Sequence, residues 1–133
     1  MLLDNLHNLQ MSMNANPSTG NNQTGYIAWQ DIPTHPDVGR SYFPTYGANY
    51  FTLNGTVVTT VMPAPRTGFL REVIHFTLVN NDNATDTLKV IVTNTGNANN
   101  NVSIYAATQA TLAMWNYERG IGWKNQSAAG LSL

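Results

Sequence analysis

Short apolar runs, separated at regular intervals by Asn, Asp, Thr and Gly, dominate the chain from residue 67 to residue 124. Within residues 69–79 and 88–93, apolar and polar positions alternate, which is typical of β-strands with one buried face. No alternation of helical and strand segments is visible, which argues against a parallel α/β fold. The side chains expected to point into a core are Ile74, Phe76, Leu78, Leu88, Val90 and Val92.

Turn residues separate these runs from further β-type segments at spacings of about ten residues, the pattern of a sandwich or barrel. The predicted strands are residues 26–30, 50–53, 56–62, 69–79, 88–93, 102–106, 111–117 and 121–124. Asn54-Gly55 predicts a type I′ hairpin, and Pro63 is expected to end the strand after it, because proline cannot donate to a ladder. We therefore expect an all-β fold, an antiparallel β-sandwich of jelly-roll-like form spanning residues 26–133.

Residues 1–25 show a different pattern. Four apolar residues at spacings of three and four predict one face of a short helix; they are Leu2, Leu6, Leu9 and Met13. Several Asn residues weaken such a helix, and a breaker run begins at Asn16-Pro17. A helix of about 12 residues is marginal by itself. We expect an extended N-terminal arm that either contacts another subunit or docks on its own domain.

Residues 31–46 contain three prolines, Pro33, Pro36 and Pro44. Each proline disfavours α geometry in the residue before it, so no helix is expected here. The segment is predicted to be an extended loop. Its aromatic side chains form a second candidate contact surface, and they are Tyr42, Phe43 and Tyr46.

The composition indicates a single domain with a largely neutral surface. The chain has 133 residues, of which 10% are charged, against roughly 25% in ordinary soluble domains. The 18 Asn and 16 Thr residues carry much of the polarity. Net charge is −1 and the six basic residues are scattered, so we expect binding neither to nucleic acid nor to an anionic membrane. Little charge repulsion opposes self-association.

Several classes of site and signal are disfavoured. The chain has no cysteine, which excludes disulfides, thiolate-ligated metals and cysteine nucleophiles. No apolar run approaches the roughly 18 residues of a membrane helix. The N-terminus lacks the basic and apolar regions of a signal peptide, so we expect the protein to be made and used without secretion through a cleaved signal.

The sequence offers weak candidates for catalysis or metal binding. His35 and Asp37 flank a proline and have no second histidine nearby. Residues 80–86 are rich enough in oxygen ligands for calcium, but they lack the glycine and the terminal glutamate of an EF-hand loop, and Asn and Asp also favour turns. No nucleophile elbow is present, and the carboxylates are scattered. We expect no catalytic residue, no metal ligand, no cofactor and no enzymatic activity.

Residues 57–130 resemble a recurring pattern in small bacteriophage virion proteins. The pattern consists of a strand ending in Pro-Ala (residues 61–65), a strand followed by Asn-Asn (74–81), a T-x-K-V-x-V-T strand (87–93) and Gly-Ile-Gly-Trp-Lys (120–124). The resemblance implies a β-sandwich of the capsid decoration, or cement, type. Such a protein is made in the host cytoplasm and sits as a homotrimer on the outer surface of the virion head, where its partners are the major capsid protein and itself.

On physical grounds, the arm and the aromatic loop are the expected contact surfaces. The candidate residues are Leu2, Leu6, Leu9, Met13, Tyr42, Phe43 and Tyr46. The alternative is a carbohydrate- or receptor-binding module of a phage tail or head fibre. The three tryptophans and six tyrosines support this alternative if they stack on sugars, but aromatic residues also fill cores and subunit contacts.

Overall fold

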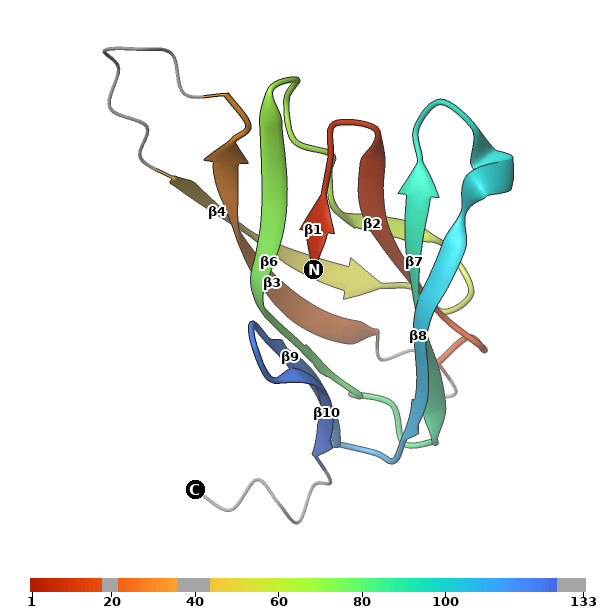
Figure 1. The fold of residues 1–133 in the computed structure, drawn as a ribbon. Helices are drawn as coiled ribbons and strands as arrows, with labels where there is room; N and C mark the ends of the chain where they lie inside the picture. The colour runs from red at the N-terminus through yellow and green to blue at the C-terminus, as the bar shows by residue number, and fades with distance from the viewer. Residues whose placement is uncertain (18–21, 36–43, 127–133) are drawn as a thin grey trace.

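The computed structural model describes residues 1–17, 22–35 and 44–126, which form two antiparallel sheets packed against each other (Figure 1). Sheet A has the strand order β10-β9-β6-β3-β4, with β1 also paired to β6. Sheet B has the order β5-β2-β7-β8. The predicted all-β antiparallel sandwich is therefore confirmed.

The strands of the two sheets alternate along much of the chain. Sheet A contains β1 (Leu2–Leu3), β3 (Gln23–Pro33), β4 (Thr45–Leu53), β6 (Phe69–Val79), β9 (Met114–Glu118) and β10 (Gly122–Gln126). Sheet B contains β2 (His7–Met13), β5 (Thr59–Met62), β7 (Asp86–Asn94) and β8 (Val102–Gln109), and the short 3-10 helix η1 (Ala98–Asn100) precedes β8. The pairs β3–β4, β7–β8 and β9–β10 are neighbours within one sheet, whereas the other consecutive strands change sheet.

The helix predicted near the N-terminus is wrong, because this segment forms β1 and β2. Leu9 pairs with Met62 on one side and with Val92 on the other, so β2 is an interior strand of sheet B. Leu9, Met11 and Met13 recur at a spacing of two, and all three are buried in the core. This strand period overrides the helical spacing because it places three apolar side chains between the sheets. The N-terminal segment is thus part of the sandwich rather than an arm outside it.

The hairpin predicted at Asn54-Gly55 is also wrong. β4 ends at Leu53 in sheet A, and β5 begins at Thr59 in sheet B. Of the two turn residues, Gly55 alone has a positive φ, of 58°, whereas a type I′ turn requires positive φ at both positions. A Cβ on Gly55 would lie 2.2 Å from Asn16 Oδ1, so glycine permits the close approach of this connection to the end of β2. The predicted end of the following strand before Pro63 is confirmed.

A β-bulge in β6 changes which residues face the core. The pairing with β3 passes from Ala28–His75 to Trp29–Val73, which leaves Ile74 as the extra residue. The Ile74 carbonyl accepts a hydrogen bond of 2.9 Å from Arg119 N–H. Val73 is consequently buried and Ile74 only half-buried, contrary to the simple alternation.

Most of the other predicted inward positions are confirmed. Phe76, Leu78, Leu88 and Val90 are fully buried, and Val92 packs against the core while half-buried. β8 departs from its predicted alternation after Ile104, because its pairing with β7 contains a register shift between Val90 and Ile91. Tyr105 and Ala107 therefore pack against the core, whereas the three residues of the expected series are exposed; these are Val102, Ile104 and Ala106.

Aromatic side chains connect the two sheets. The Trp115 ring is fully buried, and its Nε1–H on β9 donates a hydrogen bond of 3.1 Å to the Ala107 carbonyl on β8. Trp123 on β10 stacks on Tyr105 of β8 with ring centroids 4.3 Å apart, and its ring also contacts Phe76 edge-on at 5.3 Å. These contacts hold the β9–β10 hairpin against the edge strand of sheet B.

In the part of the chain that the structure describes, no helix has the length and hydropathy needed to span a bilayer.

Candidate functional site

The structure separates the predicted contact residues into three groups. Leu9 and Met13 lie in the core, so their prediction as contact residues is corrected: their side chains pack between the sheets and are not accessible to another protein. Leu2, Leu6 and Tyr46 are on the surface, with 55%, 48% and 71% of their area exposed. Tyr46 belongs to β4 rather than to a loop. Tyr42 and Phe43 lie outside the described residues.

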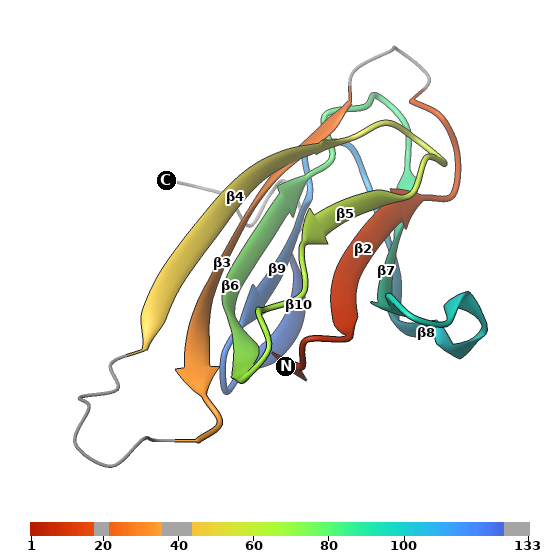
Figure 2. The ribbon, with the colours of Figure 1, turned by 90° about the horizontal axis from the view of Figure 1, so that it is seen from above.

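The connections β1–β2, β5–β6 and β7–β8 gather at one end of the sandwich, at the top of Figure 1 and in the lower half of Figure 2. Leu6 lies in the first of these connections, between β1 and β2. We call this region the loop end. It brings residues from the start of the chain beside residues from the β7–β8 pair.

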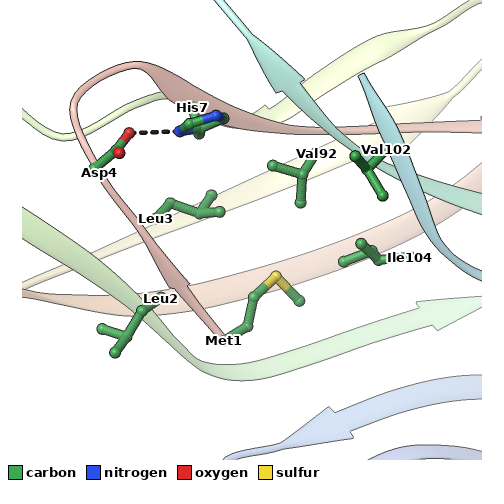
Figure 3. Close-up of a pocket in the computed structure, with 8 residues that line it drawn as sticks. All are labelled: Met1, Leu2, Leu3, Asp4, His7, Val92, Val102 and Ile104. Atoms are coloured by element: carbon green, nitrogen blue, oxygen red, sulfur yellow. Dashed lines mark hydrogen bonds and ion pairs between the residues drawn. The ribbon is translucent and has the colours of Figure 1, made fainter. Parts of the chain in front are cut away.

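An apolar groove of about 400 Å³ opens at the loop end (Figure 3). Figure 3 shows residues of β1 on one side and residues of β7 and β8 on the other, with the β1–β2 connection above. β8 is the edge strand of sheet B, and β1 has only two residues, so sheet A leaves the start of β8 uncovered. The lining residues are Met1, Leu2, Leu3, Asp4, His7, Val92, Val102 and Ile104.

The groove has one polar pair at its rim. His7 Nδ1 lies 2.5 Å from Asp4 Oδ1, which also accepts a hydrogen bond of 2.9 Å from the Leu6 N–H. The hydrogen bond from His7 and then that from Leu6 hold the pKa of Asp4 below its usual value. His7 Nε2 lies 3.4 Å from Asn94 Nδ2, so with a proton on Nδ1 the ring accepts from that amide. The pair fixes the β1–β2 connection.

A second exposed surface lies on the outer face of sheet A. Tyr50 is 82% exposed, and its ring centroid lies 4.8 Å from that of Tyr26 on β3. Tyr46 occupies the same face of β4, four residues before Tyr50, because side chains of a strand alternate between faces. We call Tyr26, Tyr46 and Tyr50 the tyrosine strip. The sequence contains a signal for it, since tyrosine and alanine follow each other at a spacing of two in both strands.

The oxygen-rich segment at residues 80–86 forms a turn whose two carboxylates are buried and which is held by side-chain amides. Asp82 and Asp86 are both almost fully buried. Gln23 Nε2 donates to Asp86 Oδ2, and Asn80 Nδ2 donates to the Ala84 carbonyl at 2.9 Å. These contacts support the turn interpretation. Burial first, and then the neighbouring charge of Asp82, raise the pKa of Asp86 above its ordinary value.

Asp86→Asn is expected to become more stable relative to the native protein as pH rises. The raised pKa means that folding favours the protonated form of Asp86. The stabilisation that protonated Asp86 gives the folded protein is therefore complete below its ordinary pKa of 3.8. This stabilisation is lost as pH rises through the pKa of Asp86 in the folded state. The asparagine of the variant keeps a carbonyl oxygen for Gln23 and carries no charge. Urea unfolding of both proteins between about pH 3 and about pH 7 measures the difference; a difference that shrinks toward neutral pH would contradict this assignment.

Within residues 1–17, 22–35 and 44–126, no group of three His, Asp or Glu side chains is placed to hold a metal ion. His35 is exposed, with Nδ1 3.1 Å from the Thr34 hydroxyl, and Asp37 lies outside the described residues.

Comparison with known proteins gives no relative: no family model, no curated protein and no solved structure matches this chain.

Proposed function

We propose that this protein is a bacteriophage virion structural protein, a capsid decoration (cement) protein that binds the outside of the assembled head. The observation that carries the proposal is the apolar groove at the loop end, whose lining residues Leu2, Val102 and Ile104 are exposed. Leu6, in the connection between β1 and β2, is exposed at the same end of the sandwich. Contiguous exposed apolar surface marks sites of protein interaction. The resemblance of residues 57–130 to small virion proteins and the low surface charge also support a role in assembly.

The proposed mechanism is mass action. A protein that binds the assembled shell and not the free capsid subunits shifts the equilibrium toward the shell by its own binding free energy. The sandwich supplies a rigid body, and the partners are the major capsid protein and two further copies of this chain. The groove takes an apolar side chain of the shell, with Leu2 and Leu6 packing at its edge. No step of this role requires catalysis or a cofactor.

Leu6→Asp and Ile104→Asp are expected to weaken binding to purified phage heads at least about thirtyfold, or about 2 kcal/mol, because each buries an unpaired carboxylate in the contact. Both side chains are exposed in the isolated protein, so the fold should persist. Co-sedimentation with heads lacking the protein measures occupancy. The matched control is Leu112→Asp, which alters a side chain of similar exposure, 55%, in the β8–β9 connection.

Full occupancy with both variants would exclude the loop end as the head contact. Light scattering on the same samples is expected to give the mass of a trimer, and a monomer at assay concentration would count against self-association. Thermal unfolding of each variant separates loss of binding from loss of fold.

A further inference from the structure

The register of sheet A arranges its outer face in rows that run across the strands. Ile27, Phe51 and Leu53 point into the core, so the residues alternating with them face outward. The rows on β4, β3 and β6 are Tyr46–Gln30–Glu72, Ala48–Ala28–His75, Tyr50–Tyr26–Thr77 and Thr52–Thr24–Val79. The tyrosine strip therefore flanks a row that begins with two alanines.

The aromatic rings of this face are open to solvent. Tyr46 and Tyr50 are 71% and 82% exposed, and the alanines between them carry no atoms beyond Cβ to cover the rings. Tyr26 supports Tyr50 from the neighbouring strand, and its ring lies 6.2 Å from that of His75. The three tyrosines of the strip are therefore not explained by burial in the core.

Hydrogen-bonding groups lie beside the rings in fixed positions. Gln30 Nε2 donates to Glu72 Oε2, and Arg119 Nη1 donates to the same oxygen at 3.2 Å. His75 Nδ1 bonds Glu118 Oε1 in the next strand. Each of these groups keeps further donor or acceptor capacity. The face thus combines apolar ring surfaces with polar groups whose orientation is set by their neighbours.

We propose that the tyrosine strip binds a neutral oligosaccharide. The C–H faces of successive sugar rings pack on Tyr50 and Tyr46, which lie about 13 Å apart along the strand. The sugar hydroxyls bond to Glu72 and His75, whose side chains are 19% and 34% exposed. Aromatic residues with one apolar and one polar end suit such amphipathic ligands. The carboxylates of Glu72 and Glu118 disfavour a strongly anionic glycan.

The composition of the face favours a sugar over a protein partner. Among the described residues of β3, β4 and β6, the exposed large hydrophobic side chains are Tyr46 and Tyr50. The core of a protein interface is depleted in charged residues, whereas this face carries the Glu72 carboxylate paired with Arg119. Sugar binding here is independent of head binding, since the substitutions of Leu6 and Ile104 leave the strip unchanged.

The test is a calorimetric titration of the full chain with cellohexaose, chitohexaose and maltohexaose. At least one is expected to bind with a submillimolar Kd. Tyr50→Ala and Tyr50→Leu should each weaken that binding by about tenfold or more, whereas Tyr50→Phe, which keeps the ring, should stay within about twofold. Leu112→Ala, which truncates an exposed side chain outside the strip, is the control and should bind as the native protein does.

Three outcomes would overturn the proposal. The first is the absence of binding by all three hexasaccharides at millimolar concentration. The second is native affinity in Tyr50→Leu, which would show that the aromatic ring is not required. The third is dissociation of an oligomer by Tyr50→Ala in light scattering, which would assign this face to a subunit contact. Unchanged thermal unfolding of the Tyr50 variants shows that the comparison concerns binding alone.

Discussion

Deletion of residues 1–16 is expected to unfold the protein. The deleted segment contains β1 and β2, and β2 lies between β5 and β7 in sheet B. Leu9, Met11 and Met13 are buried, and losing each such side chain costs about 2–5 kcal/mol. Their sum is comparable to the total stability of a domain, about 5–15 kcal/mol. The remaining strands of sheet B would also lose their backbone partners. Loss of the cooperative thermal transition and of dispersed amide resonances measures the effect.

The control for this deletion is Leu6→Ala in the same segment. Leu6 is exposed in the β1–β2 connection, so its truncation should change stability by no more than about 0.5 kcal/mol. If the truncated protein unfolds cooperatively near the melting temperature of the full chain, β2 is dispensable for folding. That result would return the segment to the role of an arm outside the sandwich.

Trp115→Ala is expected to destabilise the fold by about 3–5 kcal/mol, the cost of removing a fully buried large aromatic side chain. Trp115 is completely buried, and its indole N–H makes a direct hydrogen bond between the sheets, to Ala107. Truncation therefore leaves a cavity and also removes a connection between β9 and the edge strand β8. Urea unfolding gives the free energy of unfolding of the variant. The dependence of that free energy on urea concentration should remain the same as in the native protein.

Trp115→Phe separates these two contributions. It keeps most of the ring volume but removes the hydrogen bond, so a smaller loss of about 1–2 kcal/mol is expected. Equal losses for the alanine and phenylalanine variants would show that the hydrogen bond, rather than packing, dominates. A loss below about 1 kcal/mol for Trp115→Ala would contradict the buried position of the ring.

Local pattern is sufficient to predict the middle of the chain. The strand predicted over residues 69–79 has the observed bounds, because alternation and flanking turn residues agree there. The same pattern does not predict that Val73, rather than Ile74, points into the core. Both residues are β-branched, and the bulge between them depends on how β3 and Arg119 meet this strand, which local sequence does not record.

The prediction for the N-terminal segment fails for a different reason. Its leucines and methionines fit a helical period and a strand period at once, since Leu9 and Met13 belong to both. Pairing with Met62 and Val92, far away in sequence, decides between the two. Sequence reasoning misses the groove for the same reason, because its two walls are far apart in sequence, at residues 1–7 and 92–104, and meet only when β1 pairs with β6.

The pairing of the first strands with late partners has a consequence for synthesis. Leu2 pairs with Glu72, and His7 pairs with Asn94. At a synthesis rate of about 5–20 residues per second, the chain between Met13 and Asn94 takes roughly 4–16 s to appear. Throughout that interval, β2 lacks the neighbour that completes its burial. The apolar residues Leu9, Met11 and Met13 therefore make the nascent chain a target for aggregation or chaperone binding before the sandwich closes.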